Sequence, residues 1–477
     1  MAEFDLILSG GRVLSSQADR VCDVGLKDGR IAALGDLSAA TGPRRDVSGR
    51  VLTPGGVDVH CHIEQMSGMG QMNADTFETG TRSALMGGTT TTVSFAPQQT
   101  GKTLQASVAD YAQRAGRGAM TDHAFHLIVN DTSIPSFEED LASVIEAGHR
   151  SIKIFTTYNI KLDDAAVLEV LAVAKRAGAL VCVHAETDAL LTWTRERLLA
   201  KGLTAPSYHP VARPRLAEIE AVERMIRFAE FFATPVMLFH ISTAEAVEVI
   251  RAAKARGAPI WAETCPHYLF MSEDVLDRPG LEGAKWMCSP PQRTDADSTA
   301  LWQGLADGTL SIVSSDHAPY RFDETGKLAA GPDATFAELA NGLPGLEVRM
   351  PLMFDAIIGR GMAKPEDFVR LTATAPATLH GLEGKGDLVE GYDADIVIWE
   401  RTRRVTFGPD DLHDNVGYNP WEGRTIQGWP ETVLLRGEVV VDAGTLTTAP
   451  GTGQWIARDK LGAVATNLPA PEFEATL

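Results

Sequence analysis

The segment VDVHCHIE, residues 57–64, carries two histidines one residue apart within a short apolar run. Side chains alternate faces along a β-strand, so His60 and His62 are predicted to point one way and Cys61 the other. Two imidazoles aimed at one spot fit either hydrogen-bonded core histidines or a metal ion, since histidine is a common metal ligand. The rest of the chain has to distinguish these two interpretations.

The chain changes character at this segment. Before it, FDLILSGGRVLSS and DVGLKDGRIAALGD read as β-hairpins, broken by Gly-Gly and Asp-Gly turn signals. After it, short apolar runs alternate with helical stretches such as DDAAVLEVLAVAKRAG and TAEAVEVIRAAKARG, each ending with a glycine just past a basic last turn. The predicted strands are 57–63, 89–96, 122–129, 151–158, 180–186, 235–242, 259–265 and 311–317.

Strands that alternate with helices in this way predict an α/β fold, a parallel (β/α)₈ barrel of the TIM type. After about residue 384 the pattern of short apolar runs separated by turn signals returns, in GDLVEGYDADIVIW and TVLLRGEVVVDAGTL. We expect the two terminal β segments to join in one small β-sandwich domain beside the barrel. The predicted organisation is 1–55 and 384–447 for the β-sandwich, 56–383 for the barrel, and 448–477 for a weakly patterned C-terminal arm.

The composition excludes several classes of function. Of the 477 residues, 44% are hydrophobic and 22% charged, which is ordinary for a globular protein. The formal net charge of -20 argues against nucleic acid or an anionic membrane as a partner. We expect neither a signal peptide nor a membrane-spanning segment, because no basic start leads into a long apolar run. Five scattered cysteines without a CxxC pair fit the reducing cytoplasm.

Polar residues recur where the predicted strands end, and in such a barrel the catalytic groups lie at the carboxyl ends of the strands. They are His60, His62, Lys153, Tyr158, His184, His240 and Asp316. Four histidines and an aspartate in barrel order favour a metal site over separate core histidines. Lys153 lies between two isoleucines, where burial would lower its pKa and free a neutral amine. Such an amine can add carbon dioxide to form a carbamate that bridges two metals; a lysine paired with a carboxylate is the alternative.

These motifs resemble the amidohydrolase superfamily, and more narrowly its cyclic amidases, the dihydropyrimidinases and hydantoinases. The resemblance covers about residues 4–445 and rests on VDVHCH, KIFTTY, VHAE, FHIS and SSDHAP. Further matching segments are ETCPHYL (263–269), CSPPQR (288–293), NGLPG (341–345), TATAPATLHGL (372–382), EGYDADIVIW (390–399) and GYNPWEGR (417–424).

The resemblance implies two divalent metal ions, usually zinc, held by six side chains. These are His60, His62 and Asp316 for the more buried ion, His184 and His240 for the second, and Lys153, as N6-carboxylysine, for both. A hydroxide would complete the bridge, because two ions about 3.5–4 Å apart lower the pKa of a shared water and polarise a carbonyl. Proteins of this family are usually homotetramers.

The implied reaction opens the C–N amide bond of a cyclic amide, a dihydropyrimidine such as dihydrouracil or a 5-substituted hydantoin, to give an N-carbamoyl amino acid. Asp316 is implied as general base and then acid. Tyr158 is implied as a hydrogen-bond donor to the developing oxyanion, with a simple rim aromatic as the alternative. Its parity is opposite to that of Lys153, so Tyr158 is expected in the loop beyond the strand. Ser289 and Asn341 match positions whose backbone groups bind the amide edge of the ring.

Related activities differ at single positions. Dihydroorotases usually carry an arginine two residues after the second histidine, where this chain has Glu64, which would repel a substrate carboxylate. Allantoinases generally lack the tyrosine that follows the bridging lysine, yet an allantoinase or another cyclic-imide hydrolase remains the alternative function. Lys153 argues against a single-metal deaminase, and the filled ligand positions argue against a non-catalytic assembly homologue.

The loop over residues 64–81 departs from the dihydropyrimidinase pattern, because it is rich in methionine and lacks the expected aromatic and proline residues. Met66, Met69 and Met72 fit either an adaptable apolar pocket for the ring substituent or plain loop packing. The sequence therefore leaves the substrate open between dihydrouracil, a 5-substituted hydantoin and another cyclic imide.

Overall fold

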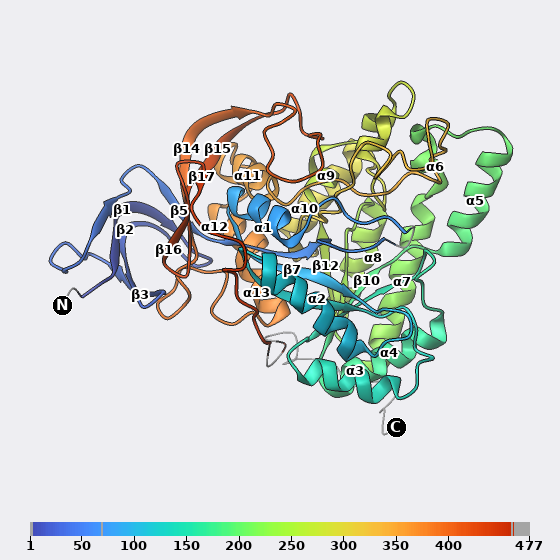
Figure 1. Ribbon diagram of the computed structural model, residues 1–477, viewed down its shortest axis with the longest axis horizontal. Helices are drawn as coiled ribbons and strands as arrows, with labels where there is room; N and C mark the ends of the chain where they lie inside the picture. Colours follow the sequence, from blue (N-terminus) through green and yellow to red (C-terminus); the bar gives the residue numbers. More distant parts are fainter. Residues whose placement is uncertain (1–2, 68–69, 459–460, 462–477) are drawn as a thin grey trace.

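The computed structural model describes residues 3–67, 70–458 and 461. Two β-sheets organise these residues, one of eight strands and one of nine. Figure 1 places the strands of the chain's first segment at one end of the molecule and the helix-wrapped sheet at the other. Within the described residues, no helix is both long enough and apolar enough to cross a membrane.

The eight strands that follow the opening hairpins form one parallel sheet in sequence order, as predicted. They are β6 (Gly56–Cys61), β7 (Thr89–Pro97), β8 (Asp122–Ile128), β9 (Ser151–Phe155), β10 (Leu180–His184), β11 (Val236–Leu238), β12 (Ile260–Thr264) and β13 (Ile312–Val313). A parallel bridge between Cys61 and His317 brings the two ends of this sheet together. The sheet therefore curls into a TIM-like barrel.

Helices cover the outside of this sheet (Figure 1). The α-helices of the described residues are α1 (Phe77–Met86), α2 (Leu104–Gly118), α3 (Phe137–Glu146), α4 (Asp164–Ala177), α5 (Asp188–Ala200), α6 (His209–Ala212), α7 (Arg215–Phe232), α8 (Ala244–Ala255), α9 (Pro266–Phe270), α10 (Asp295–Ala306), α11 (Arg349–Phe354), α12 (Pro365–Val369) and α13 (Ala375–His380). The last of them, α13, packs against the barrel interior instead. The boundaries of α4 follow from its sequence: the Asp163 side chain accepts from the backbone N–H of Ala166, and Gly178 ends the helix in the left-handed conformation.

Strands from the two ends of the chain share the second sheet. Its members are β1 (Leu6–Leu14), β2 (Asp19–Lys27), β3 (Arg30–Gly35), β4 (Arg44–Asp46), β5 (Val51–Pro54), β14 (Ile396–Thr406), β15 (Thr425–Leu435), β16 (Glu438–Asp442) and β17 (Thr445–Leu446). The two segments meet where β5 pairs in parallel with β1 and antiparallel with β14. The expected joining of the terminal segments is confirmed as one nine-stranded sheet.

The Gly-Gly turn predicted in the first hairpin is wrong. β1 continues through Gly10 and Gly11 as one strand, and its register against β2 shifts between Leu8 and Gly11. Gly10 has a φ of +76°, a conformation that glycine adopts without a steric penalty and that suits a bulge. The Asp28-Gly29 turn, by contrast, joins β2 to β3 as predicted.

Most of the predicted barrel strands are too long at their carboxyl ends. β11 ends at Leu238 and β13 at Val313, so His240 and Asp316 lie in the loops that follow. Both residues have positive φ angles, +42° for His240 and +47° for Asp316. Non-glycine residues adopt this conformation rarely, and such outliers concentrate at functional sites. An alternating apolar pattern does not encode the point where the chain turns away from the sheet.

The predicted C-terminal arm lies partly outside the described residues. Its described part runs along the barrel: the N–H of Ile456 donates to the carbonyl of His123 at 2.8 Å. The Arg458 side chain is fully buried and donates to the Ser151 hydroxyl at 2.7 Å. This part of the chain is therefore an integral piece of its own barrel.

Candidate metal centre and active site

The predicted ligands of the more buried ion lie together. Nε2 of His60 is 3.0 Å and Nε2 of His62 is 3.4 Å from Oδ1 of Asp316. The two imidazoles point to the same side, as the alternation predicts, whereas Cys61 packs into the hydrophobic core on the opposite face. One imidazole from β6, one just after it and a carboxylate after β13 thus converge at one rim of the barrel.

A buried carboxylate orients His60. Oε1 of Glu263, on β12, lies 2.6 Å from Nδ1 of His60, which leaves Nε2 to face Asp316. Burial disfavours the charged imidazole, but Glu263 and Asp316 outweigh it and raise the pKa of His60 to about 9. The two carboxylates therefore stabilise positive charge at this position, which a proton or a metal ion can supply.

The predicted ligands of the second ion also meet. The rings of His184 and His240 lie with their centroids 4.4 Å apart. Nε2 of His184 is 2.7 Å from Oε2 of Glu186, so its Nδ1 is left for a ligand. Burial lowers the pKa of His184 to about 4 and that of His240 well below its usual range. Both imidazoles are neutral at pH 7, which is the form that binds metals.

Lys153 is buried in the position that the sequence predicts. Its side chain is 1% exposed, and Nζ has no hydrogen-bond partner among the described residues. The amine lies 4.2 Å from the ring centroid of Phe239, and burial lowers its pKa to about 8. The alternative of a lysine ion-paired with a carboxylate therefore loses its support. A buried amine that is readily deprotonated fits carbamate formation.

Tyr158 lies in the loop after β9, as its parity predicts, and has a φ of +71°. Burial raises the pKa of its hydroxyl to about 12, so it remains a proton donor. Nη2 of Arg213 donates to that hydroxyl at 3.2 Å, and Nε of Arg213 donates to Oε1 of Glu186 at 3.1 Å. Glu186 thus links the metal-ligand candidate His184 to Tyr158 through Arg213.

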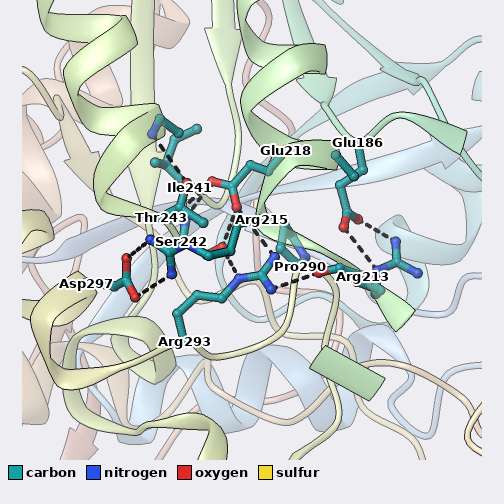
Figure 2. A network of polar contacts seen from close by, with 12 residues as sticks. Glu186, Arg213, Arg215, Glu218, Ile241, Ser242, Thr243, Pro290, Arg293 and Asp297 are labelled. Carbon is teal, nitrogen blue, oxygen red and sulfur yellow. Dashed lines mark hydrogen bonds and ion pairs between the residues drawn. The ribbon is translucent and has the colours of Figure 1, made fainter. Parts of the chain in front are cut away.

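Side-chain hydrogen bonds hold residues 213–215 at both ends (Figure 2). Arg293 donates to the carbonyl of Arg213 at 2.8 Å, and Arg215 donates to Asp297 at 2.7 Å. Glu186, Arg213 and Glu263 were not among the residues predicted for the site. A signal existed for the glutamates, because they lie in the family-like motifs VHAE and ETCPHYL. Arg213 carried no such signal.

One cavity of about 580 Å³ contains all the predicted site residues in its lining. They are His60, His62, Lys153, Tyr158, His184, His240, Ser289, Asp316 and Asn341. Oδ1 of Asn341 is buried and has no hydrogen-bond partner among the described residues. Chain segments more than 250 residues apart in sequence therefore surround one volume suited to a small molecule.

The methionine-rich loop neither forms an apolar pocket for the ring substituent nor buries its described methionines. Met66 and Met72 are 49% and 42% exposed, and neither lines the cavity, whereas Gln65 and Ser67 do. Met69 lies outside the described residues. The loop therefore supplies polar groups to the cavity, and Met66 and Met72 neither line it nor pack inside the protein.

The interpretation of Glu64 changes as well. Its Oε2 accepts from the backbone N–H of Phe77 at 3.2 Å, at the start of α1, and the residue does not line the cavity. The predicted repulsion of a substrate carboxylate by Glu64 is therefore not supported. The position still lacks the arginine that would bind such a group.

A parallel barrel with imidazoles, a buried lysine and an aspartate at the carboxyl ends of its strands defines a metal-dependent hydrolase. Residues 51–440 match the model of the amidohydrolase family, and the chain belongs to that family. It is 38% identical over 459 residues to the D-hydantoinase of Rhizobium radiobacter, covering 96% of this chain and 99% of the relative. The D-hydantoinase of Streptomyces coelicolor is 38% identical over 465 residues, covering 95% and 97%.

The solved structures give the same result. The crystal structure of dihydropyrimidinase from Brevibacillus agri superimposes with a TM-score of 0.92 at 36% identity, over 96% of this chain and 99% of that one. The L-hydantoinase from Arthrobacter aurescens gives a TM-score of 0.87 at 26% identity, over 95% and 100%. Enzymes named for D-hydantoins, for an L-hydantoin and for dihydropyrimidines thus share this fold.

Proposed function

We propose that the protein hydrolyses the C–N amide bond of a cyclic amide, a 5-substituted hydantoin or a dihydropyrimidine such as dihydrouracil, to an N-carbamoyl amino acid. The observation that carries this proposal is the single cavity into which all the predicted ligand and substrate-binding residues project. The full-length similarity to D-hydantoinases and to a dihydropyrimidinase supports the choice of substrate class.

Two divalent ions of the zinc type would occupy the ligand set. His60, His62 and Asp316 would hold one ion, His184 and His240 the other, and carboxylated Lys153 would bridge them. The residues fit this role, because the buried amine of Lys153 has no hydrogen-bond partner in the described part of the chain and the carboxylates beside His60 favour a cation. Bound there, the ions would lower the pKa of a water and polarise the scissile carbonyl.

Other side chains of the protein would transfer protons and bind the substrate. Asp316, whose pKa is held well below its usual range by its histidine neighbours despite burial, is ionised and would accept a proton from the attacking water. It would return that proton to the leaving ring nitrogen. Tyr158 would donate its hydroxyl hydrogen to the oxygen of the tetrahedral intermediate, and backbone groups of Ser289 and Asn341 would hold the amide edge of the ring.

Replacement of Tyr158 by phenylalanine is expected to lower kcat by roughly 10²–10³-fold and to change KM far less, because the lost donor acts mainly on the transition state. Steady-state kinetics on the best substrate would measure the two parameters. Tyr320→Phe provides the matched control, since Tyr320 also lines the cavity and is 7% exposed. An equal fall of kcat in both variants would contradict the specific role of Tyr158.

A substrate panel tests the function itself. We expect the zinc- and bicarbonate-treated protein to open 5-phenylhydantoin or dihydrouracil, with release of the N-carbamoyl amino acid measured by chromatography. Dihydroorotate should be a poor substrate, because no arginine occupies the position of Glu64. Preferential turnover of allantoin or succinimide would replace the proposal by the alternative function. A protein that binds both metals yet opens no member of the panel would contradict it.

We also propose the domain limits 1–55 with 384–447 for a β-sandwich, 56–383 for the barrel and 448–477 for the terminal segment.

A cytoplasmic homotetramer is the assembly expected for a protein of this family. Sedimentation velocity would measure the assembly, and a monomer in the fully metal-loaded protein would contradict it.

A further inference from the structure

A second group of ligand-type side chains lies inside the barrel, apart from the active-site cavity. It comprises His126 on β8, Cys182 on β10 and His380 at the end of α13, and all three are buried. Their ligand atoms lie within 4.8 Å of one another. None of the three lines the cavity described above. The roles assigned to the active-site residues leave these three side chains unused.

Backbone carbonyls fix the protonation of both imidazoles. Nε2 of His126 lies 2.8 Å from the carbonyl oxygen of Val59, and Nδ1 of His380 lies 3.0 Å from that of Pro376. A carbonyl oxygen only accepts, so these two nitrogens carry the protons. The opposite nitrogens, Nδ1 of His126 and Nε2 of His380, therefore each carry a lone pair.

One of these two lone pairs has no hydrogen-bond partner in the described part of the chain. Nδ1 of His126 is 3.8 Å from Sγ of Cys182, the length of a weak hydrogen bond from the thiol. Nε2 of His380 is fully buried and has no hydrogen-bond partner among the described residues. Leaving a buried acceptor unpaired is unfavourable, and a water or ion bound at this nitrogen would satisfy it.

The spacing suits a three-coordinate ion. Bonds of about 2.0 Å to two imidazole nitrogens and about 2.3 Å to a thiolate require about 3.5–3.8 Å between ligand atoms in a trigonal arrangement. The observed 3.8 Å between Cys182 and His126 is already at this value. All the ligand atoms lie within 4.8 Å of one another, so a closure of at most about 1 Å would bring the remaining pairs to these separations.

The surroundings select the kind of ion. Arg458 is fully buried, and its positive charge lowers the pKa of His380 more than that of any other charged group does. Among the described residues, the ionisable groups that shift the pKa of Arg458 are Cys182 and Arg150, and neither is a carboxylate. A fixed positive charge beside the cluster disfavours a divalent ion. A monovalent ion with one thiolate and two neutral imidazoles has no net charge, and thiolate ligands prefer soft metals.

We propose that His126, Cys182 and His380 form a binding site for a soft monovalent cation, Cu(I) or its analogue Ag(I). On binding, the thiol of Cys182 releases its proton to solvent and the sulfur bonds to the ion, while the two imidazole lone pairs complete the coordination. Ile456 and Leu461 pack against the same interior cluster as Cys182. His126, Cys182 and His380 are fully buried, so an ion reaches them during folding or through a local opening of the fold.

The test uses full-length protein already loaded with zinc and bicarbonate, so that the active-site ligands are occupied. Cu(I) is titrated anaerobically against the chelator bicinchoninate, and bound copper and zinc are counted by elemental analysis. We expect one Cu(I) per chain with the zinc content unchanged. X-ray absorption at the copper edge should give one sulfur and two nitrogen neighbours.

Three variants locate the site. Cys182→Ser should abolish copper binding, and His380→Phe, which keeps a ring of similar size, should weaken it at least tenfold while retaining the zinc. Cys22→Ser is the matched control, because Cys22 is the only cysteine that is not buried, and it should bind as the parent does. The proposal is overturned if the parent binds no copper, if Cys182→Ser or His380→Phe binds as tightly as the parent, or if Cys22→Ser abolishes binding. Displacement of the bound Cu(I) by Zn²⁺ would overturn the choice of a monovalent ion.

Discussion

Replacement of Lys153 by alanine is expected to reduce the bound metal from two ions per chain toward one or none, and to lower kcat by roughly a thousandfold or more. The reason is geometric. Lys153 lies on β9, and its buried amine has no hydrogen-bond partner among the residues that the structure describes. Elemental analysis after dialysis and steady-state turnover would measure the two effects. Retention of both metals would rule out a bridging role.

A matched pair of variants separates metal binding from stability. Lys153→Met keeps the buried volume, so it should lose metal while the thermal unfolding temperature of the metal-free protein changes little. Lys385 is also buried, but its amine lies 2.6–2.9 Å from Asp122, Asp393 and Asp395. Lys385→Met should therefore destabilise the fold by about 3–5 kcal/mol and leave the metal content intact. The reverse pattern would contradict the assignment of Lys153.

Addition of a short carboxylic acid offers a second check on Lys153→Ala. The proposed carbamate is a carboxylate on a long arm, and propionate can enter the space that the side chain vacates. We expect propionate to restore part of the metal content and of the turnover, and to have no such effect on the parent protein. Absence of rescue together with full metal content would point to a lysine that is not carboxylated.

Conversion of Asp316 to asparagine is expected to lower kcat by about 10²–10⁴-fold, the range lost when a general acid–base group is removed. Asparagine has nearly the same shape, so the fold should persist, as circular dichroism would show. The substitution also removes a negative charge that raises the pKa of His60. Weaker binding of the more buried ion is therefore expected as well.

A buried aspartate outside the cavity serves as the control. Asp387 is 6% exposed and accepts from the backbone N–H of Ser16 at 3.0 Å, and it does not line the cavity. Asp387→Asn should retain full turnover. Substantial kcat in Asp316→Asn with both metals bound would assign the proton transfer to another group.

The candidate ligands could be predicted from the sequence because each lies within or just after an apolar run that is short enough for a strand. In a parallel barrel the carboxyl ends of all strands lie on one face, so His184 and Asp316 had to lie at the same rim once the barrel was predicted. The burial of Lys153 could likewise be read from its flanking isoleucines. Strand alternation settled which side chains share a face, as His60 and His62 show.

Partners across the barrel could not be predicted in the same way. Glu263 approaches His60 from a strand 203 residues away, and Arg213 reaches Tyr158 across 55 residues. Periodicity gives the face of a residue but not its neighbour in space, because that neighbour depends on the closure of the sheet and on where each loop leads. The orientation of Glu64 toward α1 escaped the sequence for the same reason.

The sequence by itself determined the class of fold, the rim at which the chemistry lies and the identity of the candidate ligands, since these follow from local periodicity and from strand order. Only the tertiary structure decided three other features: Glu186 shared by His184 and Arg213, the bulge at Gly10, and the grouping of His126, Cys182 and His380 inside the barrel. These contacts depend on distances between segments remote in sequence. Packing of the whole barrel fixes such distances, and no single segment contains them.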